Sequence, residues 1–241
     1  MNLLDLLYPP RCPICDGPLP FTGGPSEANR HLCPECRQKP DYIHEPYCMR
    51  CGKQLETIGQ EYCHDCELRK ENSQFRRGLA AFTYSERMKP SMYAFKNGGR
   101  REYAAFYAEE IDRLYHEAIL SWQAECLVPV PLHPAKLRKR GYNQAEDLAR
   151  ALSPLLNLPV RTDLLLKIRN SAPQKNLSEK ERKNNAKNTF KLGQSILECR
   201  KIILVDDIYT TGMTLNECAR PLREAGATEI YFLTACVGRG F

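Results

Sequence analysis

Residues 201–215, KIILVDDIYTTGMTL, contain the pattern that most constrains the fold. Four apolar residues lead directly into Asp206 and Asp207, and a short threonine-rich loop around Gly212 follows them. The apolar run predicts a buried strand at 201–207, and the amphipathic segment after the loop predicts a helix at 214–226. A strand that ends in two carboxylates is tolerated at an open edge of a sheet, because buried unpaired carboxylates are strongly disfavoured.

Apolar strands alternate with amphipathic helices through most of the remaining chain. Strands that are apolar throughout are typical of a parallel sheet with helices on both faces. We therefore expect an α/β, Rossmann-like fold whose ligands bind beyond the carboxyl ends of the strands. The other predicted strands are 79–83, 126–131 and 229–237, with a strand-like stretch at 160–168, and the other predicted helices lie near 91–96, 101–121 and 142–156.

Eight of the twelve cysteines form four C-x-x-C pairs near the start of the chain. Each pair presents two thiolates to one ion, so four pairs predict two structural zinc ions. Disulfides or a redox pair are the alternatives, but a cytoplasmic chain argues against the first and the four repeats argue against the second. The simplest pairing is sequential, although the spacing also allows a crossed one. In the sequential pairing the ligand sets are Cys12, Cys15, Cys33 and Cys36, then Cys48, Cys51, Cys63 and Cys66.

The charge changes sign along the chain. Residues 1–75 hold 8 Lys/Arg and 11 Asp/Glu, whereas residues 76–241 hold 27 and 18. We place a domain boundary near residue 75, between a cysteine-rich domain and a basic domain whose charge favours phosphates or nucleic acid as partners. No run is long and apolar enough for a membrane helix, and the first residues lack a basic n-region. We expect a cytoplasmic protein without membrane insertion.

The loop that follows the acid pair has the chemistry of a phosphate cradle. Gly212 allows tight curvature, and the amides at the start of the next helix, with three threonine hydroxyls, would bind an anion. The two carboxylates would repel that phosphate, so they are expected to meet a diol or Mg²⁺. A phosphate beside a diol describes a ribose 5-phosphate.

These residues resemble the motif that binds 5-phosphoribosyl 1-pyrophosphate (PRPP) in type I phosphoribosyltransferases. Three further segments, VPVPLHPAKLRKRGYNQAEDLA at 128–149, FKNGG at 95–99 and QKNLSEKERKNNAKNTF at 174–190, resemble the ComF family of late-competence proteins, ComFC/GntX-like type. The resemblance covers nearly the whole chain. It implies that Asp206 and Asp207 contact the ribose hydroxyls and that the 5-phosphate is held by Tyr209, Thr210, Thr211, Gly212, Met213 and Thr214.

The resemblance carries further expectations. It implies a double zinc ribbon at 1–75 and a phosphoribosyltransferase-like domain at 76–241, with PRPP bound together with Mg²⁺. The family is tied to DNA uptake and natural transformation, which implies single-stranded DNA and a helicase-like protein as partners. The turn of Val130, Pro131, Leu132 and His133 would match the pyrophosphate loop, and the flexible-loop and basic candidates are Arg138, Lys139, Arg140, Gln174, Lys175 and Arg182.

Several alternatives remain open from the sequence. The basic run KLRKRG at 136–141 is either a solvated charge run or a phosphate contact, and His133 is as much a loop residue as a catalytic one. Tyr142 is either a stacking platform for bases or a core residue. PRPP would be consumed by a phosphoribosyltransferase in nucleotide or base salvage, or only bound; a PRPP-sensing regulator is weaker because no helix-turn-helix is visible. No segment resembles a nucleobase-binding hood, so the sequence identifies no acceptor.

Overall fold

A computed structural model describes residues 10–19, 32–38, 41–68, 73–169, 189–193 and 198–238 of the protein. Its centre is a four-stranded sheet in which every neighbouring pair is parallel. The register places Leu204 beside Phe232 and Val128 beside Leu204, so the apolar runs of the sequence pair along their length. The strand order is β1 (Arg77–Tyr84), β6 (Glu229–Gly238), β5 (Lys201–Tyr209) and β2 (Cys126–Pro129).

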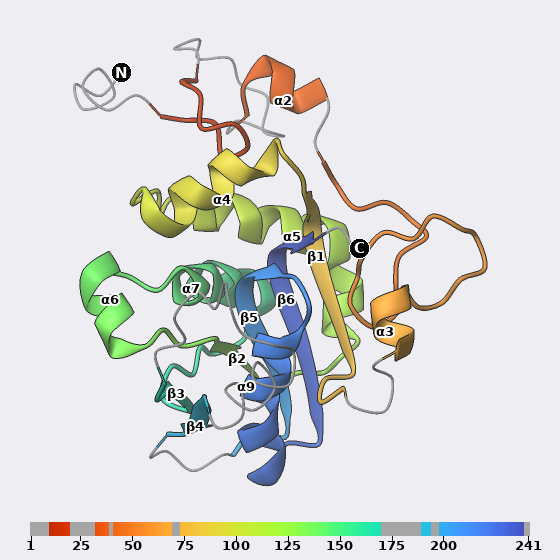
Figure 1. Ribbon diagram of the computed structural model, residues 1–241, viewed down its shortest axis with the longest axis vertical. Helices are drawn as coiled ribbons and strands as arrows, with labels where there is room; N and C mark the ends of the chain where they lie inside the picture. The colour runs from red at the N-terminus through yellow and green to blue at the C-terminus, as the bar shows by residue number, and fades with distance from the viewer. Residues whose placement is uncertain are drawn as a thin grey trace, which may run out of the picture.

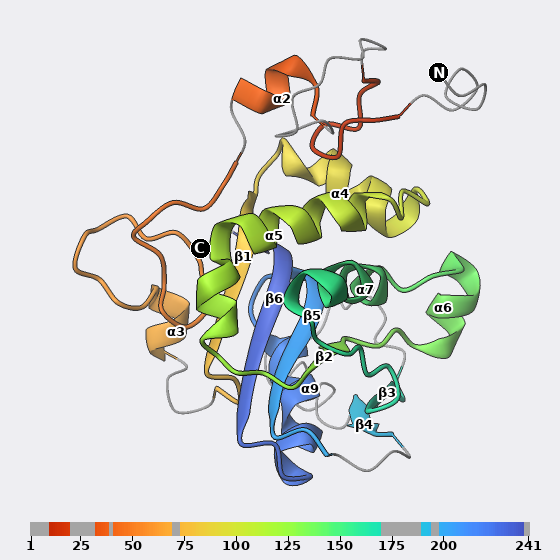
Figure 2. The ribbon, with the colours of Figure 1, turned by 180° about the vertical axis from the view of Figure 1, so that it is seen from behind.

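Helices cover both faces of this sheet (Figures 1 and 2). Side chains alternate along a strand, so Ile203 and Val205 join the core beneath the first group of helices, while Ile202 and Leu204 join the core beneath the other. The expected parallel sheet with helices on both faces is therefore confirmed. One face carries α4 (Met88–Asn97), α5 (Tyr103–Leu120) and α7 (Gln144–Leu156), and the opposite face carries α9 (Met213–Glu224).

Two stretches differ from the sequence prediction. The stretch 160–168 is not one strand: Val160 forms only an isolated bridge to Leu127, and the short β3 (Leu165–Lys167) pairs antiparallel with β4 (Phe190–Leu192) outside the main sheet. The strand predicted at 126–131 ends at Pro129, although Val130 N still donates to Val205 O at 2.9 Å; the next residue, Pro131, has no amide hydrogen.

The basic run forms a helix, α6 (Pro134–Arg140). His133 caps its first turn by accepting a hydrogen bond from the Ala135 amide at Nδ1, and Pro134 occupies the first helical position, where a missing N–H costs nothing. Gly141 ends the helix in the left-handed conformation, with φ of 85°. These local signals, rather than an apolar face, define the helix.

The cysteine-rich segment packs against the outer edge of the sheet. Its main chain bonds to β1 through Ile43 N to Ala81 O (3.1 Å) and through Gly78 N to Arg50 O (2.7 Å). The segment contains α2 (Pro34–Gln38), near α4, and α3 (His64–Leu68), beside β1 (Figure 1). A division of the chain near residue 75 stays a prediction. Within the described residues, no helix is long and apolar enough to cross a membrane.

Candidate functional site

The two aspartates lie near the end of β5, at what we call the carboxyl edge of the sheet. Strand alternation directs them to opposite faces. Asp207 points toward α4 and α7, whereas Asp206 lies close enough to Cys218 on α9 for its negative charge to help raise the pKa of that thiol. Each carboxylate also accepts a hydrogen bond from the next amide, Asp207 N to Asp206 Oδ1 at 2.9 Å and Ile208 N to Asp207 Oδ1 at 2.7 Å. The acid pair therefore straddles the edge of the sheet.

Asp207 is buried and held by two helices that the sequence places far from it. Lys96 Nζ, in the last turn of α4, lies 3.0 Å from Asp207 Oδ2. Gln144, at the start of α7, donates through Nε2 to the same oxygen at 3.0 Å. Arg140 in turn donates to Gln144 Oε1. This network connects the acid pair to α6. Sequence reasoning missed Lys96 and Gln144 as site residues, although Lys96 lies in the FKNGG segment that signalled the family.

The ionisable groups at the carboxyl edge have pKa values shifted from their ordinary ones. Burial, reinforced by the negative charge of Asp207, raises the pKa of Asp206 to about 7, although Lys96 and Lys167 partly offset the rise. Burial alone would lower the pKa of Lys96, but the two carboxylates outweigh it and raise that pKa. Burial and the nearby charge of Lys136 lower the pKa of Lys167. Asp206 is thus placed to change its charge near neutral pH.

The loop after β5 depends on Gly212. This residue is in the left-handed conformation, with φ of 76°, and begins α9. A Cβ atom built on Gly212 would lie 2.7 Å from the Tyr209 hydroxyl, so a larger residue would clash with that ring. The Tyr209 ring is buried and stacks on Phe232 with centroids 4.9 Å apart. Glycine is therefore required both for the backbone and for the space above Tyr209.

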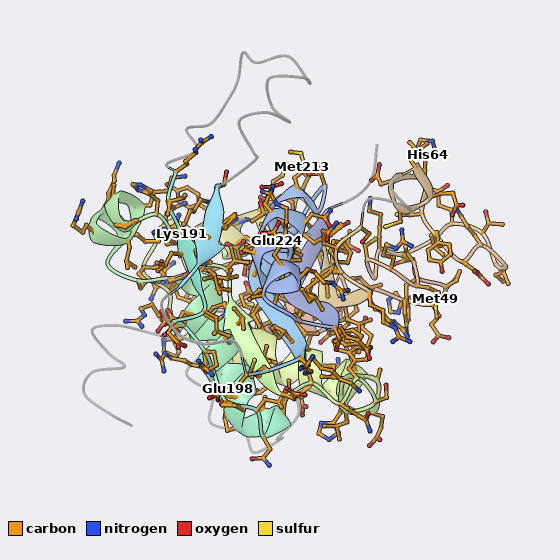
Figure 3. The ribbon with its side chains drawn as sticks, turned by 90° about the horizontal axis from the view of Figure 1, so that it is seen from below. Met49, His64, Lys191, Glu198, Met213 and Glu224 are labelled. Carbon is orange, nitrogen blue, oxygen red and sulfur yellow. The ribbon has the colours of Figure 1, made fainter. Side chains whose placement is uncertain are left out.

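The residues predicted to hold the 5-phosphate differ in how far their side chains are exposed to solvent. The Tyr209 side chain faces the core, where burial and the nearby thiols of Cys51, Cys66 and Cys63 raise its pKa. Only its main chain remains for contact with a ligand at the loop. Thr210 and Thr214 are exposed and Thr211 is half-buried. Met213, at the start of α9, points outward with 45% of its surface exposed (Figure 3).

The turn predicted to match a pyrophosphate loop lies next to the acid pair. Val130 N donates to Val205 O at 2.9 Å, immediately before Asp206. Asn143 Nδ2 donates to Val130 O at 3.1 Å and so fixes the turn from α7. Pro131, Leu132 and His133 are half-buried. The sheet therefore brings this turn and the loop at 210–214 to one edge, as strand order requires.

The basic candidates separate into two groups. Arg138 and Lys139 are exposed on α6, while Arg140 is tied to Gln144 and lies 3.4 Å from Asn97 Oδ1. Gln174, Lys175 and Arg182 lie outside the described residues. The interpretation of Tyr142 as a stacking platform is wrong: its ring is buried and its hydroxyl donates to Phe95 O at 2.6 Å, so it belongs to the core.

The eight paired cysteines form two four-thiol clusters with the sequential pairing. A tetrahedral zinc ion with bonds of about 2.3 Å places neighbouring sulfurs about 3.8 Å apart. The Cys15 and Cys33 sulfurs are 3.8 Å apart, and those of Cys51 and Cys63 are 3.6 Å apart, so both donor sets fit zinc. His44 and His64 are exposed beside the clusters and do not belong to them. Four thiolates fill the coordination sphere, so a bound ion would cross-link the chain rather than react.

Comparisons with known proteins agree with this architecture. A family model described as a double zinc ribbon domain matches residues 3–67, and one described as a phosphoribosyl transferase domain matches residues 137–240. Fold and cysteine clusters thus define a protein that joins a double zinc ribbon to a phosphoribosyltransferase-like domain. A solved structure of glutamine PRPP amidotransferase from Bacillus subtilis aligns with a TM-score of 0.41 and 18% identity, covering 60% of this chain and 30% of that one.

Curated relatives specify the family. Competence protein ComFC of Streptococcus pneumoniae is 32% identical over 207 residues, which cover 83% of this chain and 84% of that protein. The chain therefore belongs to the ComFC family of competence proteins. Competence protein F of Haemophilus influenzae is 42% identical over 108 residues, covering 44% of this chain and only 47% of that relative. DNA utilization protein YhgH of Escherichia coli is 26% identical over 214 residues, covering 88% and 86%.

Proposed function

We propose that the protein binds PRPP with Mg²⁺ at the carboxyl edge of the sheet and acts on or beside single-stranded DNA during DNA uptake and natural transformation. The observation that carries this proposal is the loop at 210–214, which opens α9 directly beside Asp206 and Asp207. No acidic side chain occupies the first turn of α9. The free amides of that turn are therefore available to a phosphate.

The 5-phosphate, the ribose and the pyrophosphate of PRPP require different surroundings, and in this proposal each meets suitable groups at the carboxyl edge. The 5-phosphate suits the loop at 210–214, where backbone amides and threonine hydroxyls donate. The ribose hydroxyls and Mg²⁺ suit the carboxylates, of which Asp207 keeps its charge compensated by Lys96. The pyrophosphate suits the turn at 130–133, with α6 behind it. Mg²⁺ would bridge the pyrophosphate and the ribose, since hard oxygen donors are its preferred ligands.

A ligand panel tests the ribose-phosphate proposal. Titration calorimetry with PRPP, ribose 5-phosphate and pyrophosphate, each with and without Mg²⁺, should show that PRPP binds more tightly than either fragment. The reason is that PRPP alone engages both loops at once. The affinity for PRPP should fall when Mg²⁺ is withdrawn. If PRPP binds no more tightly than pyrophosphate, the loop at 210–214 does not hold the 5-phosphate.

Single-stranded DNA is the polymer that best fits the basic surface. Arg138 and Lys139 project from α6 at the same edge, and the relatives are named for competence and DNA utilization. A single strand would be held mainly through its phosphates, so its binding should be strongly salt-dependent. A helicase-like protein partner, implied by the family resemblance, is part of the same proposal. Direct binding of that partner is its test.

An active phosphoribosyltransferase of nucleotide or base salvage is the second candidate function. The observation that favours it is geometric: the turn at 130–133 and the loop at 210–214 meet at one edge beside the acid pair, so the ribose of bound PRPP would be held between its two phosphate groups. Release of pyrophosphate from PRPP would be measured with a panel of free bases. Pyrophosphate release in the presence of one of the bases supports catalysis. If PRPP binds but no base causes pyrophosphate release, the site only binds PRPP.

A further inference from the structure

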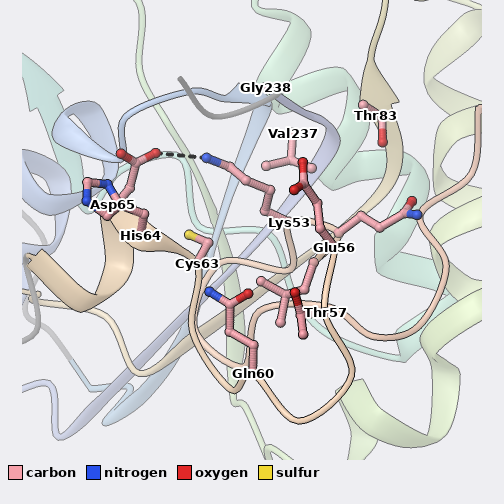
Figure 4. Close-up of a pocket in the computed structure, with 12 residues that line it drawn as sticks. Lys53, Glu56, Thr57, Gln60, Cys63, His64, Asp65, Thr83, Val237 and Gly238 are labelled. Atoms are coloured by element: carbon pink, nitrogen blue, oxygen red, sulfur yellow. Dashed lines mark hydrogen bonds and ion pairs between the residues drawn. The ribbon is translucent and has the colours of Figure 1, made fainter.

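Outside the proposed PRPP site, the protein has a second hollow between the second cysteine cluster and the sheet. A cavity of about 880 Å³ opens between the loop at 53–65 and the carboxyl ends of β1 and β6 (Figure 4). This volume is within the range of small-molecule binding sites. Thr83 and Val237 line it from the sheet, and Thr57 and Gln60 line it from the cysteine-rich segment. Neither part of the chain forms the cavity alone.

The cavity lies one strand from the acid pair. Its lining includes Gly238 at the end of β6, which is the strand between β1 and β5. A Cβ atom placed on Gly238 would be 3.5 Å from Tyr209 O and 3.6 Å from Thr210 Cα. The wall of the cavity therefore touches the beginning of the loop at 210–214. A molecule in the cavity would be a neighbour of a ribose phosphate bound at that loop.

The charges on the wall exclude a second phosphate. Lys53 Nζ is 2.8 Å from Asp65 Oδ2, so its charge is already compensated (Figure 4). Glu56 adds a further carboxylate to the lining. An anion would therefore meet a net negative wall. The occupant should be neutral, and it should offer both donors and acceptors.

The remaining lining groups suit a flat polar heterocycle. Thr57 and Thr83 contribute hydroxyls, which both donate and accept. Gln60 donates through Nε2 to Tyr62 O at 2.8 Å, which leaves its amide oxygen as an acceptor. Leu55 and Val237 contribute apolar carbon to the wall. Nucleobases have this combination of apolar faces and an edge with alternating donors and acceptors.

We infer that this cavity binds a nucleobase, either a free base or a base carried on single-stranded DNA. The inference rests on the proposed function, because the occupant would lie next to the PRPP site. It also gives the zinc-ribbon segment a second role, since that segment supplies nine of the twelve residues that line the cavity. The cysteine-rich segment would then do the work of a nucleobase-binding hood, for which the sequence shows no recognisable segment.

A filling substitution tests the inference. Thr57 is exposed, so Thr57→Trp should fill the cavity without disturbing the core. The matched control is Thr228→Trp, at an exposed threonine before β6, at the opposite end of the sheet. Zinc content and circular dichroism would confirm that both variants fold as the parent does. The affinity for PRPP should be the same in all three proteins.

Two ligands distinguish the sources of the base. Free bases are examined one at a time by ligand-observed NMR with the parent and both variants. A single-stranded oligonucleotide of about ten nucleotides is compared with an abasic oligonucleotide of equal length, whose phosphates are identical. If the cavity takes bases from a strand, the parent should prefer the normal oligonucleotide by about tenfold, and Thr57→Trp should remove that preference.

Each outcome decides the inference. Saturation transfer to a free base that Thr57→Trp abolishes and Thr228→Trp retains supports a free base as the occupant. If the parent prefers the normal oligonucleotide to the abasic one, and only Thr57→Trp removes that preference, the occupant is a base carried on single-stranded DNA. If PRPP binds but neither effect is seen, the cavity inference is wrong and the PRPP proposal stands. If PRPP does not bind while Thr57→Trp abolishes base binding, the PRPP proposal is wrong and the cavity inference stands.

Discussion

At the scale of single residues, the proposed chemistry depends on how Asp206 and Gly212 differ from their neighbours. Lys96 and Gln144 both contact Oδ2 of Asp207, so they fix this carboxylate at the edge. Asp206 has no such cation at hydrogen-bonding distance among the described contacts, and its pKa is raised to about 7. Gly212 is the residue that lets the loop turn above Tyr209. Asp206 and Gly212 therefore lead to one prediction each.

Binding of Mg²⁺ and PRPP should release a proton from Asp206. A cation or a hydroxyl donor prefers the ionised carboxylate, so binding lowers the pKa of Asp206 from about 7. Affinity should therefore rise between pH 6 and pH 8, roughly the range over which this group loses its proton. Proton release is measured by calorimetry at pH 7 in two buffers of different ionisation enthalpy. Asp206→Asn should release fewer protons; equal release in both proteins would mean that only the phosphates of PRPP titrate.

Gly212→Ala should destabilise the protein and weaken PRPP binding together. The substitution adds a strained left-handed backbone, which costs about 1–3 kcal/mol, and a clash with the Tyr209 hydroxyl. Gly226→Ala is the matched control, because Gly226 also has a positive φ, 108°, but open space around its Cβ position. Urea unfolding and PRPP titration would be compared. Equal losses of stability in the two variants would show that the Tyr209 ring does not restrict the loop.

At the scale of elements, long apolar runs could be predicted from the sequence and short capped elements could not. The strands around 201–207 and 229–237 are confirmed because each is a nearly continuous apolar run, most of whose residues are buried. The helix α6 has only Leu137 as a large apolar side chain, so nothing periodic indicates it. The β3–β4 pair joins segments on either side of a polar stretch, and only tertiary packing shows that they meet.

The candidate site divides in the same way. The acid pair and the loop with Gly212 are adjacent in sequence, and a local motif predicts them. Gln144 reaches Asp207 across 63 positions of the chain, so its role depends on how α7 packs on the sheet. Tyr142 could not be assigned from the sequence because an aromatic residue at a helix start fits either the core or a ligand surface.

The helix α6 should contribute to DNA binding through its two exposed bases only. Arg138→Gln/Lys139→Gln removes two positive charges without touching the Arg140–Gln144 contact. The slope of log K against log[salt] for single-stranded DNA should become shallower by about 1.4, or about 0.7 for each lost phosphate contact. The control is Lys89→Gln/Arg150→Gln, at exposed bases on α4 and α7. An unchanged slope in the α6 variant would remove this helix from the interface.

At the scale of the whole molecule, the two cysteine clusters support different faces of one sheet. The first cluster packs with α4 and α5, while the second belongs to the core that contains Phe232 and Tyr209. The second cluster thereby lies beneath the loop at 210–214, because Tyr209 is in contact with both. Zinc bound in that cluster would stabilise the floor of the proposed site as well as the fold.

Loss of the second cluster should therefore affect PRPP binding more than loss of the first. Cys63→Ser and Cys33→Ser each remove one thiolate, the first in a buried cluster and the second in a partly exposed one. Both variants should bind one zinc ion fewer and melt at a lower temperature, since a structural metal contributes directly to folding. Only Cys63→Ser should also lower PRPP affinity at a temperature where both proteins are folded. Equal PRPP affinities would separate the second cluster from the site.

The central claim is that the carboxyl edge around Asp206 and Asp207 holds PRPP, and its most direct test is the affinity of a double variant. PRPP with Mg²⁺ is titrated into Asp206→Ala/Asp207→Ala and into the control Glu109→Ala/Glu117→Ala, which removes two exposed acids from α5. The account predicts that the acid-pair variant loses PRPP binding by at least about tenfold (1.4 kcal/mol), while the control binds as the parent does. Parent-like affinity in a folded acid-pair variant would contradict the claim.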